Sequence, residues 1–158
     1  AQATATLTIV DNDTPVGNPP TISDVPNQTT NDDTPTGAIA VTVGDAETPA
    51  ASLVVTATSS NTTLVPNANL VLGGSGANRT LTITPAADRS GTTTVTLTVT
   101  DADGRTATDT FVLTVAAVND APTANGQSVS TPRGVAVPVT LTGTDPDGDP
   151  LTYAIVTG

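Results

Sequence analysis

The sequence lacks cysteine, histidine, lysine, methionine and tryptophan altogether. Without cysteine and histidine it has no thiol or imidazole for nucleophilic or general-base catalysis, and it lacks the usual ligands of structural zinc and haem. Without lysine it cannot form a Schiff base, a P-loop phosphate clamp or a lysine-asparagine isopeptide bond. These absences exclude most classes of enzyme.

Aromatic residues are almost missing as well, because Phe111 and Tyr153 are the only two. Protein surfaces that bind carbohydrate usually present several aromatic rings, so we do not expect a carbohydrate-binding surface. A glycosidase needs two carboxylates in a cleft, one of them in apolar surroundings. The carboxylates of this chain fall in predicted loops instead, and we therefore expect no enzymatic activity.

Positive charge is scarce. Four arginines stand against 15 acidic side chains, which gives a formal net charge of −11 at neutral pH. Nucleic acids and anionic membranes attract proteins through basic patches, and no run of about 18 apolar residues is present to span a bilayer. We expect neither nucleic-acid binding nor membrane insertion, and the obvious counter-ion for the chain is a divalent metal.

Threonine, in contrast, accounts for 35 of the 158 residues. Threonine and valine are β-branched and favour strands, and apolar residues alternate with polar ones in several segments. Clusters of Gly, Pro, Asn and Asp separate these segments, among them residues 73–76. Seven or eight short strands in about 100 residues predict an all-β sandwich of two sheets. The predicted strands are 21–25, 39–43, 53–58, 64–66 with 70–72, 80–84, 92–100 and 107–115.

One hairpin is predictable in detail. Residues 101–105 join the two clearest strands, and a three-residue loop keeps Val95 opposite Phe111 on the apolar face. A two-residue loop would place threonine against that face, so we expect the longer loop, with Gly104 in the left-handed conformation. The same register puts Asp109 on the apolar side. Strand pairing gives no reason for a charged residue on that face unless a bulge lies nearby.

The two ends do not look like complete modules. Residues 3–10 form one predicted strand, and the C-terminal segment holds predicted strands at 127–130, 135–142 and 151–156, too few to bury a core alone. We therefore divide the chain into the last strand of a preceding module, a linker, a complete sandwich, a second linker and the opening strands of a further module. The corresponding ranges are 1–13, 14–20, 21–117, 118–122 and 123–158.

Carboxylates gather in short clusters within the predicted loops. Two carboxylates spaced two residues apart can face one cation, and calcium takes about six to eight oxygen ligands. In a sandwich of this kind, the loops after the second and sixth strands emerge at the same end as the N-terminal linker. Aspartate is also an ordinary turn residue, and this simpler reading stays open. The clusters are Asp11/Asp13, Asp45/Glu47, Asp101/Asp103, Asp120 and Asp145/Asp147/Asp149, of which the first three are expected to converge.

Two of these clusters resemble a known family. Residues 118–122 (VNDAP) followed by 145–149 (DPDGD) resemble the linker and downstream D-x-D loop of cadherins, and more closely the cadherin-like and Ig-like tandem modules of large bacterial surface adhesins. The resemblance implies calcium ligands at Asn119, Asp120, Asp145 and Asp147. Residues 5–13 look like the closing strand of a Calx-beta module.

A third match lies in the loop at the far end of the predicted sandwich, where Asp88 and Arg89 resemble the start of the D-R-E motif of cadherins. Ser90 stands in place of the glutamate, and Ala121 in place of the last asparagine of the linker motif. Fewer calcium ions than in a vertebrate cadherin are therefore implied. The full set of candidate metal ligands is Asp11, Asp13, Asp45, Glu47, Asp88, Asp101, Asp103, Asn119, Asp120, Asp145, Asp147 and Asp149.

These patterns leave three functions open. The first is an extracellular spacer in an adhesin or fibre, stiffened by calcium between neighbouring modules of the same chain. The second is a subunit of an extracellular filament, in which like subunits donate strands to incomplete end modules. The third, more remote, is ice or surface binding by the regular threonine array, which a twisted sheet does not favour.

Overall fold

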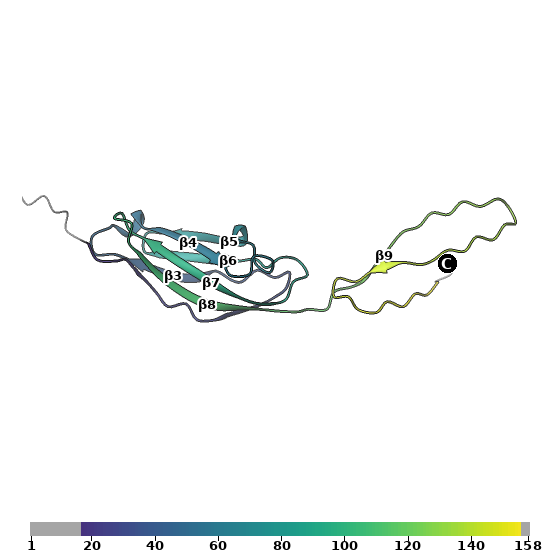
Figure 1. Ribbon diagram of the computed structural model, residues 1–158, viewed down its shortest axis with the longest axis horizontal. Helices are drawn as coiled ribbons and strands as arrows, with labels where there is room; N and C mark the ends of the chain where they lie inside the picture. Colours follow the sequence, from purple (N-terminus) through teal and green to yellow (C-terminus); the bar gives the residue numbers. More distant parts are fainter. Residues whose placement is uncertain (1–16, 156–158) are drawn as a thin grey trace, which may run out of the picture.

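The computed structural model describes residues 17–155. The predicted strand at 3–10 and the candidate ligands Asp11 and Asp13 lie outside this range. Eight strands between residues 21 and 116 form the sandwich, and the C-terminal segment extends from one end of it (Figure 1). Within residues 17–155, no helix has the length and apolar character needed to cross a membrane.

Two four-stranded sheets make up the sandwich. The first has the order β1 (Thr21–Ile22), β3 (Ile39–Gly44), β6 (Asn78–Ile83) and β5 (Leu70–Ser75). The second has the order β2 (Gln28–Asn31), β8 (Thr106–Ala116), β7 (Gly91–Thr100) and β4 (Val54–Ser59). The β2–β8 pair is parallel and the others are antiparallel. The first strand of the fold is thus divided into two parts, β1 in the first sheet and β2 in the second. This strand order is that of an Ig-like sandwich and confirms the predicted fold class.

The core lies between the sheets and is almost entirely aliphatic. In β3 and β7, buried residues alternate with residues of the outer face, as the period of two predicts. Phe111 is the one aromatic side chain in this core and is 2% exposed. The most deeply buried side chains are Val41, Val43, Val65, Leu81, Ile83, Val95, Leu97, Val99 and Leu113.

The outer face of the second sheet carries rows of threonine. Thr58, Thr96 and Thr110 lie opposite one another across β4, β7 and β8, and the next row repeats the pattern. Hydroxyl groups keep this nearly charge-free face compatible with water. The rows follow strands of an Ig-like sheet, and such sheets twist, whereas an ice surface is flat. Ice binding by the rows stays a prediction.

The β7–β8 hairpin has the predicted register. Val95 lies opposite Phe111 without interruption of the ladder, and the backbone N–H of Asp101 donates to the carbonyl of Arg105 at 3.0 Å. The loop therefore contains three residues. Gly104 within it has φ 83°, the left-handed conformation that was expected of it.

Asp109 faces inward opposite Leu97, as the register predicts, although no bulge is present. Its Oδ2 accepts a hydrogen bond from the backbone N–H of Val25 at 3.2 Å. Val25 is buried where the chain crosses from β1 in one sheet to β2 in the other. The carboxylate supplies the acceptor that this crossing segment would otherwise lack.

Replacing Asp109 by alanine is therefore expected to lower the free energy of unfolding by about 1–3 kcal/mol, because the N–H of Val25 loses its acceptor. Asp109→Asn keeps an oxygen acceptor and is the matched control. Urea denaturation of both variants measures the difference. Equal stabilities for the two variants would mean that the hydrogen bond to Val25 contributes nothing.

Some predicted elements differ in the structure. Leu64 and Val65 are buried, but they lie in a turn in which both backbone N–H groups bond to Asn61 instead of forming a strand. The predicted turn at 73–76 is shorter, because β5 continues to Ser75. Short 3-10 helices occupy Ala50–Ser52 and Asn67–Asn69.

The C-terminal segment has less strand than expected. Residues 127–130, 135–142 and 151–155 are not in strands, and pairing is limited to β9 (Thr123–Ala124) with β10 (Gly143–Thr144). A strand persists only when neighbouring strands complete its hydrogen bonds and cover its apolar face. The described part of this segment does not supply those neighbours.

Candidate metal-binding clusters at the two ends of the sandwich

The loop between β7 and β8 is organised by Asp101. Its side chain is 7% exposed, and its Oδ1 accepts hydrogen bonds from the backbone N–H groups of Asp103 at 2.9 Å and Arg105 at 2.8 Å. Asparagine and aspartate cap turns in this way because their short side chains reach the backbone two residues on. One oxygen of Asp101 is thus committed to the loop itself.

Asp45 plays a similar part after β3. Its Oδ1 accepts the backbone N–H groups of Glu47 and Thr48, and the bond from Thr48 is the main cause that lowers the pKa of the Asp45 carboxyl. The other oxygen, Oδ2, is buried and has no hydrogen-bond partner among the described residues. Asp45 is therefore ionised at neutral pH with one oxygen in use.

These two loops meet the N-terminal linker at one end of the sandwich. The Glu47 carboxylate accepts hydrogen bonds from the backbone N–H of Asn18 at 3.1 Å and from its Nδ2 at 3.0 Å. Gly17 lies against Asp103, whose Oδ2 would be 3.2 Å from a Cβ at that glycine. The predicted convergence of these loops with Asp11 and Asp13 is not tested, because those two residues lie outside the described range. Within residues 17–155 no three carboxylates at this end share a centre, so metal binding here stays a prediction.

At the opposite end of the sandwich, three carboxylates do share one centre. Oxygens of Asp33, Asp88 and Asp120 all lie within 4.8 Å of one another. Asp33 follows β2, Asp88 lies in the loop between β6 and β7, and Asp120 follows β8. Three loops that are distant in the sequence therefore deliver one oxygen each.

The backbone at this end is shaped to bring these side chains together. Asp33 and Asp88 have φ angles of 52° and 53°, in the left-handed region that aspartate tolerates better than most residues. The N–H of Asp88 donates to Oδ1 of Asp33 at 3.1 Å. Both turns therefore expose carboxylates toward the same space.

Asp32 and Asp147 fix the segment that leaves the sandwich. Asp32 is buried, and its Oδ1 accepts the N–H of Val118 at 3.0 Å. Two residues on, the N–H of Asp120 donates to Oδ2 of Asp147 at 2.6 Å. A carboxylate of the C-terminal segment is thereby added to those contributed by the sandwich.

The electrostatics of Asp120 are unfavourable without a cation. Removal of its carboxyl from water raises the pKa of Asp120, and the neighbouring charges of Asp33, Asp147, Asp88 and Asp32 raise it further. Its Oδ2 is buried and lacks a hydrogen-bond partner in the described part of the chain. Clustered carboxylate oxygens with one unsatisfied buried atom fit a hard divalent cation such as calcium.

The loop at 145–149 repeats the conformation of the β7–β8 loop. Oδ1 of Asp145 accepts the N–H groups of Asp147 at 3.0 Å and Asp149 at 3.2 Å, and Gly148 has φ 77°. Asp145 is therefore a turn cap that presents Asp147 to the junction. Asp149 contributes its backbone N–H to this cap, and its side chain is not in the three-carboxylate group.

The structure thus brings together Asp88 and Asp120 of the candidate ligands, with Asp147 beside them. Asn119 is adjacent and donates its Nδ2 to the carbonyl of Asp120 at 3.1 Å. Asp33 was not among the candidates, because its surroundings, NDDTP, have the composition of an ordinary turn. The pair of adjacent aspartates, Asp32 and Asp33, was the available signal.

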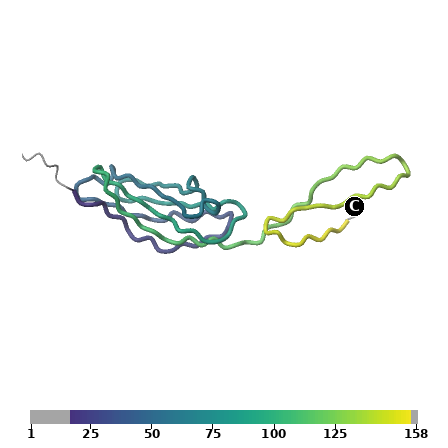
Figure 2. Tube along the Cα trace, in the orientation of Figure 1, coloured from purple at the N-terminus to yellow at the C-terminus, as the bar shows by residue number. Residues whose placement is uncertain are grey.

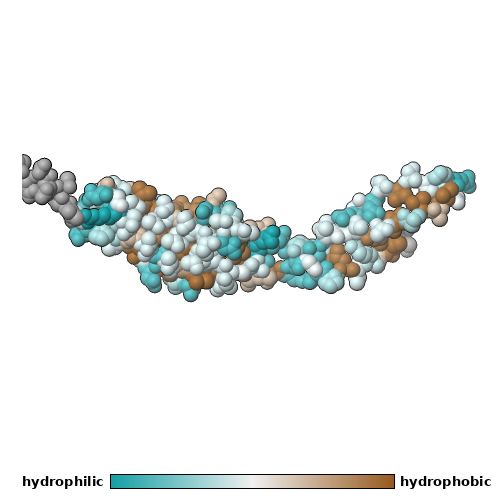
Figure 3. Space-filling model, viewed as in Figure 1, coloured by the Kyte–Doolittle hydropathy of each residue, from teal (hydrophilic) through white to brown (hydrophobic). Residues whose placement is uncertain are grey.

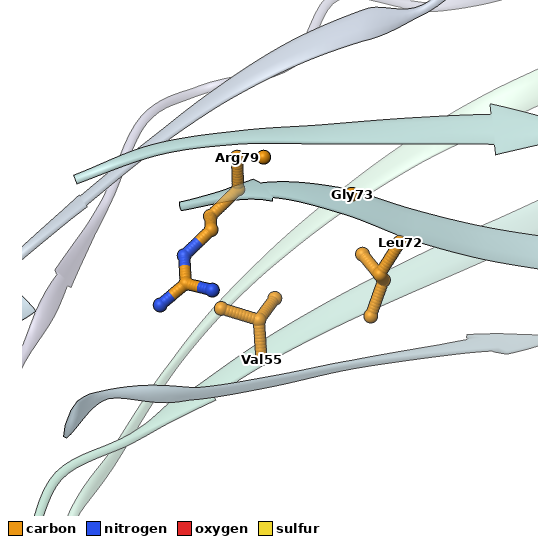
Figure 4. A pocket seen from close by; sticks show the side chains of 5 residues that line it. Val55, Leu72, Gly73 and Arg79 are labelled. Carbon is orange, nitrogen blue, oxygen red and sulfur yellow. The ribbon is translucent and has the colours of Figure 1, made fainter. Parts of the chain in front are cut away.

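A small cavity elsewhere has a different character. It has a volume of about 110 Å³ between edge strands β4 and β5, and its lining residues are Val55, Leu72, Gly73, Gly74 and Arg79. Figure 4 shows the guanidinium of Arg79 extending toward Val55. Its Nε donates to the carbonyl of Gly76 at 2.9 Å and its Nη2 to that of Ala50 at 3.1 Å. Arg79 is therefore a structural cross-link, and this cavity holds no metal-ligating set.

No protein-family model matches the sequence, and comparison with curated proteins finds no match. Among solved structures, the chain is similar to the titin domains Z1Z2 in complex with telethonin, with 18% sequence identity and a TM-score of 0.46. The similarity covers 69% of this chain and 53% of the titin chain, so the matched region is about half of that chain.

Proposed function

We propose that this chain is a structural segment of an extracellular adhesin or fibre, in which calcium stiffens the joint between the sandwich and the segment that follows it. The observation that carries this proposal is the group formed by Asp33, Asp88 and Asp120. It stands where the chain leaves the sandwich, and Asp147 of the following segment adjoins it.

The bound ion would act mechanically. It would neutralise carboxylates that otherwise repel one another, and it would connect oxygens from both sides of a short linker. Residues 118–122 would then behave as a stiff joint in place of a flexible tether. A series of such joints gives a rod that projects its far end away from a surface.

The proposed location of the protein rests on the affinity for calcium that is expected of such a site. Extracellular calcium modules bind the ion with dissociation constants of about 10⁻⁴ to 10⁻³ M. Calcium at such a site would be bound at extracellular concentrations and released inside a cell. We therefore propose an extracellular or cell-surface location, and a structural role in place of catalysis.

A distance measurement tests the joint directly. Because the chain has no cysteine, Thr56→Cys and Ser130→Cys provide two unique sites for spin labels, one on the sandwich and one on the C-terminal segment. We expect a narrow distribution of distances between the labels in millimolar calcium and a broad one in excess chelator. Distributions of equal width under the two conditions would rule out calcium stiffening.

A labelled pair within the sandwich, Thr56→Cys with Thr108→Cys, is the control. These residues lie in the second sheet, in β4 and β8 on either side of β7, so their separation does not depend on the joint. The distribution for this pair should be the same with and without calcium. A change in this control would indicate that calcium alters the sandwich and not the joint.

A further inference from the structure

One side of the sandwich carries no negative charge. Residues 48–87 contain neither aspartate nor glutamate, and Arg79 is their only charged side chain. This stretch forms β4, β5 and β6, and Figure 2 shows its blue and teal trace along one side of the sandwich. In Figure 3 the strongly hydrophilic, teal residues gather mainly at the two ends of the sandwich, with mostly white residues between them. An anionic group that approaches this acidic chain therefore meets the least repulsion at this side.

Two edge strands border the cavity at Arg79 on this side. β4 is an edge of the second sheet and β5 an edge of the first, and the cavity lies between them. β4 is capped at one end, where Nη2 of Arg79 donates to the carbonyl of Leu53 at 3.3 Å. At its other end, the N–H of Ser59 donates to Oδ1 of Asn67 at 2.9 Å. A strand that adds to β4 would have to displace these two caps.

β5 presents an edge that is open to another strand. Just before it, the N–H of Thr84 donates to the carbonyl of Asn69 at 3.1 Å, so the odd-numbered residues that follow direct their backbone groups toward β6. The N–H groups of Leu72 and Gly74 therefore point away from the sheet. Edge strands are usually protected by charged residues, prolines or bulges. β5, with the sequence LVLGGS and an unbroken register, has none of these.

The inner face of this edge has an unfilled position beside Arg79. Gly74 lies opposite Arg79 in the register of β5 and β6. A Cβ at Gly74 would clash with the carbonyl oxygen of Asn78 and would lie 2.8 Å from Cα of Arg79. The position therefore stays without a side chain, and the cavity of about 110 Å³ is left next to the guanidinium. A strand beside β5 would direct every second side chain between the sheets, and one of these would enter the cavity.

The chemistry of the cavity favours a carboxylate as the group that enters it. Nε and Nη2 of Arg79 bond to backbone carbonyls, which carry no net charge, and within residues 17–155 its Nη1 donates to no atom. The guanidinium lies beside the side chain of Val55 (Figure 4). In such partly apolar surroundings a charge-assisted hydrogen bond to a carboxylate is stronger than in water. The acid-free side of the sandwich adds no competing carboxylate of its own.

We propose that the free edge of β5 is a docking site for an extended acidic peptide segment of another protein. The segment pairs with the backbone of β5, and one of its inward-facing carboxylates accepts a hydrogen bond from Nη1 of Arg79. The backbone pairing supplies affinity, and Arg79 supplies the selectivity for an acidic residue. All residues of this site lie within the complete sandwich, so the site is independent of the calcium-stiffened joint and goes beyond the spacer function.

Binding of a designed peptide tests the site. The probe is a peptide with blocked ends and the sequence TVTETVT, which reads the same in both directions and places glutamate between two valines on one face. Its neutral counterpart is TVTQTVT. Titration of the probe into the isotope-labelled chain, in chelator, should shift the amide resonances of Leu72 and Gly74 and slow their hydrogen exchange. The glutamate peptide should bind about tenfold more tightly than the glutamine peptide.

Two variants of β4 provide a matched pair for this titration. Val55→Glu brings a carboxylate of the chain itself to the Arg79 guanidinium and should abolish the preference for the glutamate peptide. Val54 is 58% exposed on the outer face of the same strand, so Val54→Glu adds the same charge outside the cavity and should retain the preference. Arg79→Gln should bind both peptides equally. The β4 pair decides the question if loss of the Arg79 cross-link unfolds the sandwich.

Four results would overturn the proposal. Amide resonances of Leu72 and Gly74 that do not move at millimolar peptide would exclude docking at β5. Equal affinities of the two peptides for the wild-type chain would show that Arg79 does not select a carboxylate. Free acetate that binds as tightly as the glutamate peptide would indicate a small-anion site without strand pairing. Protection of Leu72 and Gly74 that rises with chain concentration, in the absence of peptide, would show that the edge pairs with a second copy instead.

Discussion

Replacing Asp120 by asparagine is expected to abolish the stabilisation of the chain by calcium. For a site with a dissociation constant of about 10⁻⁴ to 10⁻³ M, 10 mM calcium should raise the free energy of unfolding by about 1.4 to 2.7 kcal/mol. The corresponding rise in melting temperature is roughly 5–15 °C. Asp120 is central to the effect because it lies between Asp33 and Asp88 on the sandwich and Asp147 on the following segment.

In chelator, the same substitution should raise the stability of the chain above that of the wild type instead of lowering it. Because the pKa of Asp120 is raised in the folded chain, the carboxyl favours folding when it is protonated. That contribution is fully present below its unfolded pKa of 3.8 and is lost as the pH rises through the raised folded value. Asparagine resembles the protonated acid at all pH values, so the variant should melt at a higher temperature than the wild-type chain at pH 7 without calcium.

Melting curves at pH 7 with calcium and with chelator measure both effects. Asp24→Asn removes the same charge at an exposed position that is not in the three-carboxylate group and should retain the wild-type response to calcium. If Asp120→Asn and Asp24→Asn show equal calcium shifts, the ion is not bound at this junction. The loops that carry Asp33, Asp88 and Asp120 would then be turns alone.

The second large effect is expected in the core. Phe111→Ala should lower the free energy of unfolding by about 3–5 kcal/mol, because the ring is 2% exposed and its removal leaves a cavity between the sheets. Domains of this kind are stable by only about 5–15 kcal/mol. The melting temperature should therefore fall by more than 10 °C.

The neighbouring residue provides the control for this experiment. Val112 is 38% exposed on the outer face of the same strand, and Val112→Ala should change the stability by less than about 0.5 kcal/mol. Chemical denaturation of the two variants gives the comparison. Similar losses at both positions would mean that β8 does not alternate between core and solvent as the structure has it.

The strands with an apolar period of two were predictable because one face of each lies on the core. β7 and β8 show this most clearly, and the requirement to keep threonine off the core face determined the loop length and the register together. β2 was not predictable in the same way. Its sequence, QTTN, has no apolar residue, and it is a strand only because it pairs with the end of β8.

Prediction of the candidate metal site was limited by a different cause. The resemblance to cadherin-like modules pointed to Asp88 and Asp120, which the fold brings together, but Asp33 joins them through long-range packing of loops that local sequence does not encode. For Asp45, Asp101 and Asp145, in contrast, the local turn accounts for the role of the side chain. Each is in an acidic cluster, and each uses an oxygen to cap its own turn.

The division of the first strand between the sheets has a consequence for a chain under tension. The chain enters the sandwich at one end and leaves at the other, and β2 runs parallel to the end of β8. Pulling on the two ends would slide these strands past each other in opposite directions. The hydrogen bonds between residues 28–31 and 113–116 would then share the load in shear, and would break together instead of unzipping one after another.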